Sequence, residues 1–133
     1  MTLTTTARLA LVAAGIWQFV SWGGRISLLT DVETADPWNW FRIGGSLAVG
    51  VAVLAVGIGL VRRHPVALTI AWAYLAVGLV TWSRSLFNVW TEPNTLGFRL
   101  VHTALALATW LLGVVAVAVV RRSVDRAPVG ASG

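Results

Sequence analysis

Four long apolar runs, separated by short polar segments, dominate this chain. The first begins near Leu9 and is expected to continue as a helix to about Leu29, and the others cover 41–61, 66–90 and 98–120. At about 1.5 Å per helical residue, each run can cross a hydrocarbon core of about 30 Å. We therefore predict an all-α, polytopic membrane protein with four transmembrane helices.

Several landmarks of the chain occur twice. Asp36-Pro37 followed by Phe41-Arg42 returns as Glu92-Pro93 followed by Phe98-Arg99, and a pair of arginines closes both the second and the fourth run. Self-similarity of this kind indicates an internal repeat, here of two helical hairpins. The predicted divisions are a four-helix domain at 1–126, a first repeat at about 7–63, a second repeat at about 66–122, and a flexible tail at 127–133.

Composition places the chain in the membrane class. Hydrophobic residues make up 57% of it, charged residues make up 11%, and the mean hydropathy is +0.79. The net charge of +5 would suggest nucleic acid in a soluble chain, but here the basic residues are all arginines at the ends of apolar runs. We therefore expect no nucleic-acid partner. The lack of cysteine excludes disulfides and thiolate metal sites.

The distribution of charge predicts the orientation. Because short loops rich in arginine stay on the cytoplasmic side, the count favours cytoplasmic termini in the plasma membrane. The arginines of the predicted inner side are Arg8, Arg62, Arg63, Arg121, Arg122 and Arg126. The outer side carries Asp31, Glu33, Asp36 and Glu92.

Small residues at helical spacing predict where the helices pack. Such stripes let helix backbones approach closely, which drives association in lipid. On the third run the stripe is Ala67, Ala71, Tyr74, Gly78, Thr81 and Ser85, and on the fourth it is Ala106, Thr109, Gly113 and Ala116. The second run offers two small-residue faces: Ala48, Ala52, Ala55 and Gly59, or Ser46, Gly50 and Gly57. One of these faces could serve the bundle and the other a partner chain.

The residues expected to contact a ligand or lipid are Arg25, Arg42, Arg84, Arg99 and His102. The four arginines occupy repeat-related positions near the outer interface.

The sequence also predicts partners for these side chains. Spacing pairs Trp22 with Arg25 and Trp38 with Arg42 for cation–π contact. Arg99 is expected to pair with Glu92, whereas Arg25 is expected to contact a lipid or a partner. The simplest role for His102 is a hydrogen bond to a loop carbonyl or to Glu92.

No catalytic or metal-ligating motif stands out, and we expect no cofactor. A b-type haem normally takes two histidines at similar depth, but His64 and His102 lie on opposite sides of the predicted membrane. None of the five acids falls within a predicted span, which counts against proton-coupled transport.

The second half of the chain resembles a known family. The segment Trp82-Ser83-Arg84-Ser85-Leu86-Phe87-Asn88-Val89-Trp90, followed by Phe98-Arg99-Leu100-Val101-His102, is similar to short actinobacterial membrane proteins with two helices and no established function. The similarity lies mainly in 74–122. It implies that a hairpin can exist as a unit and that this chain is a tandem of two, and it implies no activity.

The function predicted from these observations is that of a small non-enzymatic integral membrane protein, a scaffold or accessory subunit of a membrane complex. Its expected partners are membrane lipids and either further copies of the chain or a larger membrane complex. Two alternatives stay open: a transporter of a small solute, ion or lipid, and a quinone- or haem-associated accessory subunit of a respiratory enzyme that uses His102.

Overall fold

The computed structural model describes residues 2–126, and these form helices and connecting turns with no strand. The all-α prediction is confirmed. Four helices form the bundle: α1 (Thr5–Gln18), α3 (Pro37–Gly57), α4 (His64–Thr91) and α5 (Leu96–Asp125). A short helix, α2 (Asp31–Thr34), lies between α1 and α3. The predicted tail at 127–133 lies outside the described residues.

Three helices, α3, α4 and α5, are long and apolar enough to cross a membrane. With 21, 28 and 30 residues, they extend over about 31, 42 and 45 Å. The chain is therefore a helical protein with the character of a multi-pass membrane protein. Helix α1 has only 14 residues before its regular hydrogen bonding stops.

The expectation that the first α-helix continues regularly to about Leu29 is wrong. After Gln18 the backbone widens into a π-helical turn, Phe19–Gly23, and a 3-10 turn, Ile26–Leu28, follows. Two adjacent glycines, Gly23 and Gly24, weaken the α-helix here, because glycine is about 1 kcal/mol less favourable than alanine in a helix. The π turn places Trp22 inside the bundle, with only 1% of its surface exposed.

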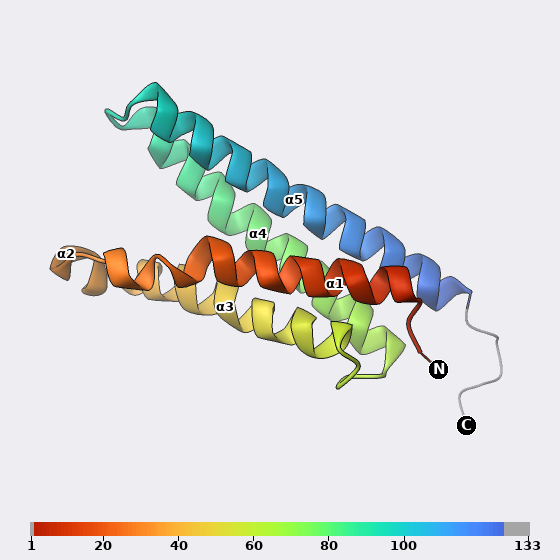
Figure 1. The fold of residues 1–133 in the computed structure, drawn as a ribbon. Helices are drawn as coiled ribbons and strands as arrows, with labels where there is room; N and C mark the ends of the chain where they lie inside the picture. The colour runs from red at the N-terminus through yellow and green to blue at the C-terminus, as the bar shows by residue number, and fades with distance from the viewer. Residues whose placement is uncertain (1, 127–133) are drawn as a thin grey trace.

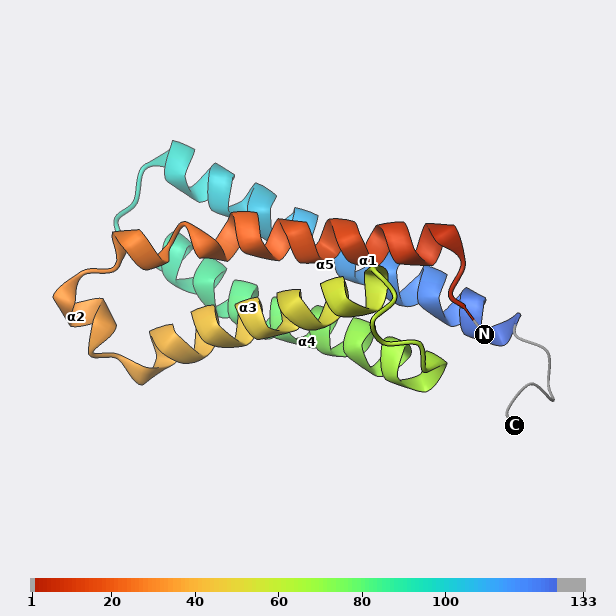
Figure 2. The same cartoon turned by 60° about the horizontal axis from the view of Figure 1, so that its bottom comes forward.

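The helices form two antiparallel hairpins, α1 with α3 and α4 with α5 (Figure 1). The hairpins meet where α1 packs on α5 and where α3 packs on α4. One end of the bundle holds the start of α1, the end of α5 and the α3–α4 connection, and we call it the termini end. The opposite loop end holds α2 and the α4–α5 connection, and the two hairpins diverge towards it (Figures 1 and 2).

Helix α3 ends earlier than its apolar run, which continues to Val61. Gly59 adopts a left-handed conformation with φ of 87°. Its N–H donates to the carbonyl of Val56, and the N–H of Leu60 donates to the carbonyl of Ala55. These two bonds form a Schellman motif, which satisfies the last carbonyls of the helix. The helix therefore ends at Gly57.

The loop end is held by caps on its helices. Thr30 and Glu33 form a capping box at the start of α2, and Asp36 accepts a hydrogen bond from the N–H of Trp38 at the start of α3. Thr95 caps α5 by accepting from the N–H of Phe98. The two acid-proline steps thus differ in structure: Asp36-Pro37 begins a helix directly, whereas Glu92 follows the end of α4, three residues before Thr95.

The small-residue stripes of α4 and α5 lie inside the bundle. Ala67, Ala71, Tyr74, Gly78, Thr81 and Ser85 are buried on α4, and Ala106, Thr109, Gly113 and Ala116 are buried on α5. A Cβ added at Gly78 would lie 3.0 Å from Thr109 Cγ2, and one added at Gly113 would lie 2.8 Å from Leu75 Cδ1. The α4–α5 hairpin therefore packs too closely at these positions for a larger side chain.

On α3, the face turned into the bundle is the one with Ser46, Gly50 and Gly57, all of which are buried. Ala48 is exposed, and Ala52 and Ala55 are half-buried. Gly57 lies directly against the backbone of α1.

Polar side chains in the bundle interior form hydrogen bonds between helices. Trp17 Nε1 donates to Thr109 Oγ1 over 2.9 Å, Gln18 Nε2 donates to the carbonyl of Ser46 over 3.3 Å, and Trp110 Nε1 donates to the carbonyl of Gly78 over 3.1 Å. The first bond joins α1 to α5, the second joins α1 to α3, and the third joins α4 to α5. Each hairpin is therefore fixed internally, and Trp17 also fixes one hairpin to the other.

Two glycine substitutions on α3 test this close packing. A Cβ at Gly57 would lie 3.0 Å from the main-chain nitrogen of Val12 and 3.1 Å from the carbonyl oxygen of Arg8, and backbone atoms cannot move aside. We expect Gly57→Ala to lower the free energy of unfolding in detergent by about 1–3 kcal/mol. Thermal unfolding followed by circular dichroism measures the change.

Gly44→Ala is the matched control on the same helix, because a Cβ at Gly44 would meet no neighbouring atom within 4 Å. Alanine should stabilise this position by up to about 1 kcal/mol through its better helix propensity. Equal melting temperatures for the two variants would contradict the close contact between α1 and α3.

Candidate binding site at the loop end

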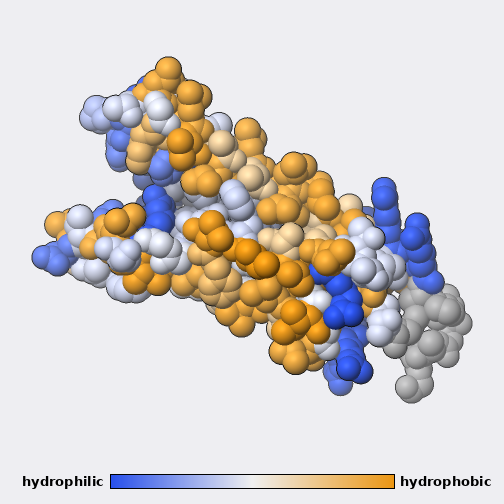
Figure 3. Space-filling model, viewed as in Figure 1, coloured by the Kyte–Doolittle hydropathy of each residue, from blue (hydrophilic) through white to orange (hydrophobic). Residues whose placement is uncertain are grey.

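A polar cavity of about 330 Å³ lies at the loop end of the bundle. Figure 3 shows hydrophilic surface in the notch between the two diverging arms, beside a largely apolar surface along the helices. The cavity is lined by Arg25, Glu33, Asp36, Trp38, Asn39, Arg42, Arg84, Ser85, Asn88, Val89, Glu92, Asn94, Phe98 and His102. The structure thus brings together four of the five residues predicted to contact a ligand, and Arg99 lies outside the lining.

Arg25 follows the π turn and reaches across to the other hairpin. Its guanidinium lies over the ring of Trp22, 5.4 Å from the centroid, as the sequence predicted. Its Nη2 lies 3.4 Å from Nε2 of His102 on α5. Burial lowers the pKa of Arg25, and the nearby charge of Glu33 opposes this effect. The guanidinium nevertheless stays charged, because arginine does not lose its proton in proteins.

His102 is buried between the two hairpins, and the contacts of its two nitrogens define its tautomer. Nδ1 lies 2.9 Å from the carbonyl oxygen of Phe98, which can only accept, so in the neutral ring Nδ1 carries the proton. Nε2 then accepts from Arg25. A bond from Nε2 to a haem iron would have to displace this arginine. The carbonyl that His102 contacts belongs to its own helix, whereas the sequence predicted a loop carbonyl or Glu92. Through Nε2, His102 orients Arg25.

Arg42 also lies over Trp22, with 5.7 Å between its guanidinium carbon and the ring centroid. The predicted pairing of Arg42 with Trp38 is therefore wrong. Nη2 of Arg42 donates to Asn39 Oδ1 over 2.7 Å, and Nη1 donates to Ser85 Oγ over 3.3 Å. The second bond crosses from α3 to α4. Arg42 turns towards the bundle axis because these acceptors and Trp22 lie there.

Trp38 instead carries Arg84, whose guanidinium carbon lies 4.1 Å from the ring centroid. Arg84 comes from α4 and Trp38 from α3, so this contact too joins the two hairpins. Spacing along one helix could not reveal it, because Trp38 and Arg84 lie on different helices, about a third of the chain apart.

Arg99 does not form the predicted ion pair with Glu92. Its Nη2 donates to the main-chain carbonyl of Glu92 over 3.1 Å, and its guanidinium lies 5.4 Å from the ring centroid of Trp90. The carboxylate of Glu92 is exposed and makes no hydrogen bond to another described residue. Arg99 therefore fastens the α4–α5 turn.

The acids of the cavity are kept apart from its arginines. Between residues 2 and 126, Arg121 and Asp125 form the only ion pair within 4.0 Å, and they lie at the termini end. Glu33 accepts from the main-chain N–H and the hydroxyl of Thr30, and these bonds lower the pKa of its carboxyl. Asp36 is occupied by its cap on α3. Helix capping thus holds two carboxylates away from the guanidinium groups.

Two donors beside the cavity are left without an acceptor. Nη1 of Arg25 and Nε of Arg42 are buried and form no hydrogen bond with the described residues. A buried donor without a partner costs about 1–3 kcal/mol, and more when it is charged. The loop end thus holds two charged donors whose hydrogen-bonding capacity is unused among the described residues.

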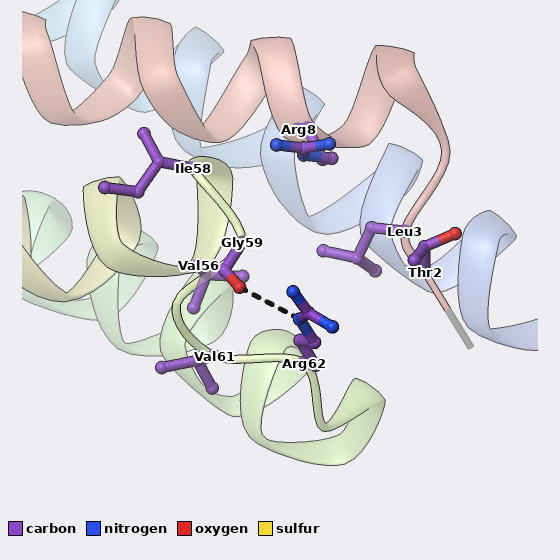
Figure 4. A pocket seen from close by; sticks show the side chains of 8 residues that line it. All are labelled: Thr2, Leu3, Arg8, Val56, Ile58, Gly59, Val61 and Arg62. Carbon is purple, nitrogen blue, oxygen red and sulfur yellow. Dashed lines mark hydrogen bonds between the residues drawn. The ribbon is translucent and has the colours of Figure 1, made fainter.

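A smaller cavity of about 180 Å³ lies at the termini end (Figure 4). It is lined by Thr2, Leu3, Arg8, Val56, Ile58, Gly59, Val61 and Arg62. Nε of Arg8 donates to the carbonyl of Gly57 over 2.9 Å, and Nε of Arg62 donates to the carbonyl of Gly59 over 3.4 Å. Both arginines therefore donate to main-chain carbonyls at and just beyond the end of α3, which is a structural role.

Sequence reasoning missed several residues of the loop-end site. Asn39 and Ser85 hold Arg42, and Trp82 packs on Trp22 with 5.3 Å between ring centroids. Asn39 stands three positions before Arg42, which is a signal for a contact on one helix face. The partners on other helices left no such signal.

Comparison of the chain with family models, with curated proteins and with solved structures gave no significant match. The tandem resemblance therefore stays a prediction. The function has to be inferred from the residues and their contacts.

Trp22 is the residue whose loss should most disturb this site. It supports two guanidinium groups and packs on Trp82, which is 2% exposed. We expect Trp22→Ala to lower the free energy of unfolding in detergent by about 3–5 kcal/mol, the usual cost of removing a buried aromatic side chain.

Trp72→Ala is the control, because 51% of the Trp72 surface is exposed. Its substitution should shift the melting temperature in detergent much less. If both variants melt alike, the Trp22 cluster does not hold the hairpins together.

Proposed function

We propose that this chain is a four-span protein of the plasma membrane, with both termini in the cytoplasm, that acts as a non-enzymatic scaffold or accessory subunit of a membrane complex. The observation that carries this proposal is a bundle interior packed with buried side chains inside an apolar outer surface. Cross-helix hydrogen bonds from Trp17, Gln18 and Trp110 occupy the middle of the bundle, and the two cavities described above lie at its ends.

The first span of this topology is α1 together with the π turn. Helix α1 and the turn that follows it have 14 and 5 residues, which extend over about 29 Å. Helix α1 packs antiparallel to α3, which is long enough to cross the membrane. The first segment therefore runs alongside a membrane-spanning helix in the opposite direction, which supports four spans.

The arginine distribution supports cytoplasmic termini. Arg8, Arg62, Arg121 and Arg122 belong to the termini end, and the acids of α2 and its flanks belong to the loop end. Loops rich in arginine stay in the cytoplasm during insertion.

The outer faces of the helices support an accessory role. Large apolar side chains are exposed on all four bundle helices, and they include Ile16, Val51, Leu79 and Leu111. Lipid or another membrane subunit can cover such surfaces. With its interior closed by side chains, the bundle is better suited to hold neighbouring molecules than to pass a solute between its helices.

Reporter fusions test the topology. A reporter placed after Gly133 should be active only in its cytoplasmic form, and one inserted between Asp31 and Asp36 only in its exported form. The reverse pattern would contradict the orientation, because the arginine-rich loops would then lie outside. Activity of both reporters on one side would contradict three spans between the two reporter sites.

Native mass spectrometry tests the accessory role. The tagged chain is extracted from its own membrane in polymer nanodiscs, which retain neighbouring subunits. We expect a defined stoichiometry with further copies or with one other membrane protein. A second sample, tagged differently and mixed in only after extraction, measures chance association. A chain that carries only lipid in every preparation would contradict the proposal.

A further inference from the structure

The loop-end cavity holds opposite charges that do not neutralise each other. Three arginines and three acids line it, yet no ion pair within 4.0 Å joins them in the part of the chain described. Exposed charges of opposite sign usually approach when nothing holds them apart. The three arginines, Glu33 and Asp36 are restrained by their own contacts, and the carboxylate of Glu92 is free of hydrogen bonds to the described residues.

On the positive side of the cavity the arginines lie on aromatic rings, and two of their donors have no acceptor among the described residues. Trp22 carries Arg25 and Arg42, and Trp38 carries Arg84. Nη1 of Arg25 and Nε of Arg42 are buried without an acceptor among the described residues. Guanidinium groups suit phosphate oxygens, which accept several charge-assisted hydrogen bonds at once. This side therefore fits a phosphate group.

The negative side is formed from the other hairpin as well as from α2. Glu92 lies at the start of the α4–α5 turn, and its exposed carboxylate makes no hydrogen bond to another described residue. Glu33 and Asp36 add acceptor oxygens to the same cavity. Carboxylates bind a primary ammonium through its N–H groups, whereas a quaternary ammonium has none and favours a cage of free aromatic rings. Trp38 is already covered by Arg84.

We propose that the loop-end cavity binds a group that carries both a phosphate and a primary ammonium, with the phosphate at Arg25, Arg42 and Arg84 and the ammonium at Glu92. This inference requires the membrane position of the loop end but not the accessory role. The cavity of about 330 Å³ is of a size for a headgroup, at the lower limit for small-molecule sites of about 300–1,000 Å³. Such a group could be part of a membrane lipid or of a soluble compound.

Binding would join the two hairpins where they diverge. Arg25 and Arg42 belong to the first hairpin and its connection, and Arg84 and Glu92 belong to the second. A ligand that contacts both should therefore raise the melting temperature as well as bind.

The experiment measures binding to the purified full chain in detergent by tryptophan fluorescence and melting temperature. The probes are phosphatidylethanolamine, phosphatidylglycerol, phosphatidylcholine and soluble phosphoethanolamine. We expect phosphatidylethanolamine to bind about tenfold more tightly than phosphatidylglycerol or phosphatidylcholine, because each of those lacks the charged hydrogen bonds of a primary ammonium. Equal affinity of soluble phosphoethanolamine would identify a soluble ligand, and much weaker binding would identify the lipid.

Two variants test the ammonium contact and the phosphate contact separately. Glu92→Gln should weaken phosphatidylethanolamine binding about tenfold and leave phosphatidylglycerol binding unchanged, whereas Arg42→Gln should weaken both. Asp125→Asn and Arg121→Gln are the matched controls, because these residues are exposed at the termini end. If Arg42→Gln does not fold, Arg84→Gln replaces it, since Arg84 is exposed.

Three results would overturn the proposal: no binding of any probe, binding of phosphatidylglycerol as tight as that of phosphatidylethanolamine, or equal effects of Glu92→Gln and Asp125→Asn. A reversed orientation in the reporter experiment would contradict the topology without changing these affinities. The two failures are therefore distinguishable.

Discussion

The contact between Trp22 and Trp82 is the constraint on which the loop end depends. Their rings lie 5.3 Å apart and belong to different hairpins. Together with Ile43 and Ala106 they form the apolar cluster of this end. Because Trp22 also supports two guanidinium groups, the position of the charges follows from the packing of one indole ring.

The size of the core side chains explains the shape of the bundle. The cluster at the termini half is built largely from small residues, with alanines on α1, α4 and α5. The cluster at the loop half contains two tryptophans. Helices separated by alanine can approach closely, whereas helices separated by indole rings cannot. The hairpins therefore meet at the termini end and open at the other, where the polar cavity lies (Figure 1).

Much of this architecture could be predicted from the sequence, because lipid imposes simple requirements on length and apolarity. The runs 41–61, 66–90 and 98–120 became α3, α4 and α5, with ends that moved by a few residues. The stripe from Ala67 to Ser85 could be read because residues on one helix face follow a fixed spacing.

What could not be predicted were contacts between helices distant in sequence. The partners of Arg42, Arg84 and His102 depend on how the hairpins rotate against each other, and spacing within one helix contains no information on that rotation. Helix α2 is a different case: Thr30 and Glu33 have the spacing of a capping box, a signal that sequence reasoning could have used.

The π turn at Phe19–Gly23 takes up one residue more than a regular helix would hold in the same span. Its hydrogen bonds enclose one residue more than those of an α-helix. Each residue turns an α-helix by about 100°, so in a regular helix the additional residue would rotate everything beyond it relative to α1. The wide turn absorbs that residue locally, and Trp22 lies inside the bundle while Arg25 reaches His102. Straightening of this turn without loss of a residue would therefore move the arginine of the polar end, while the packing of α3, α4 and α5 could stay as it is.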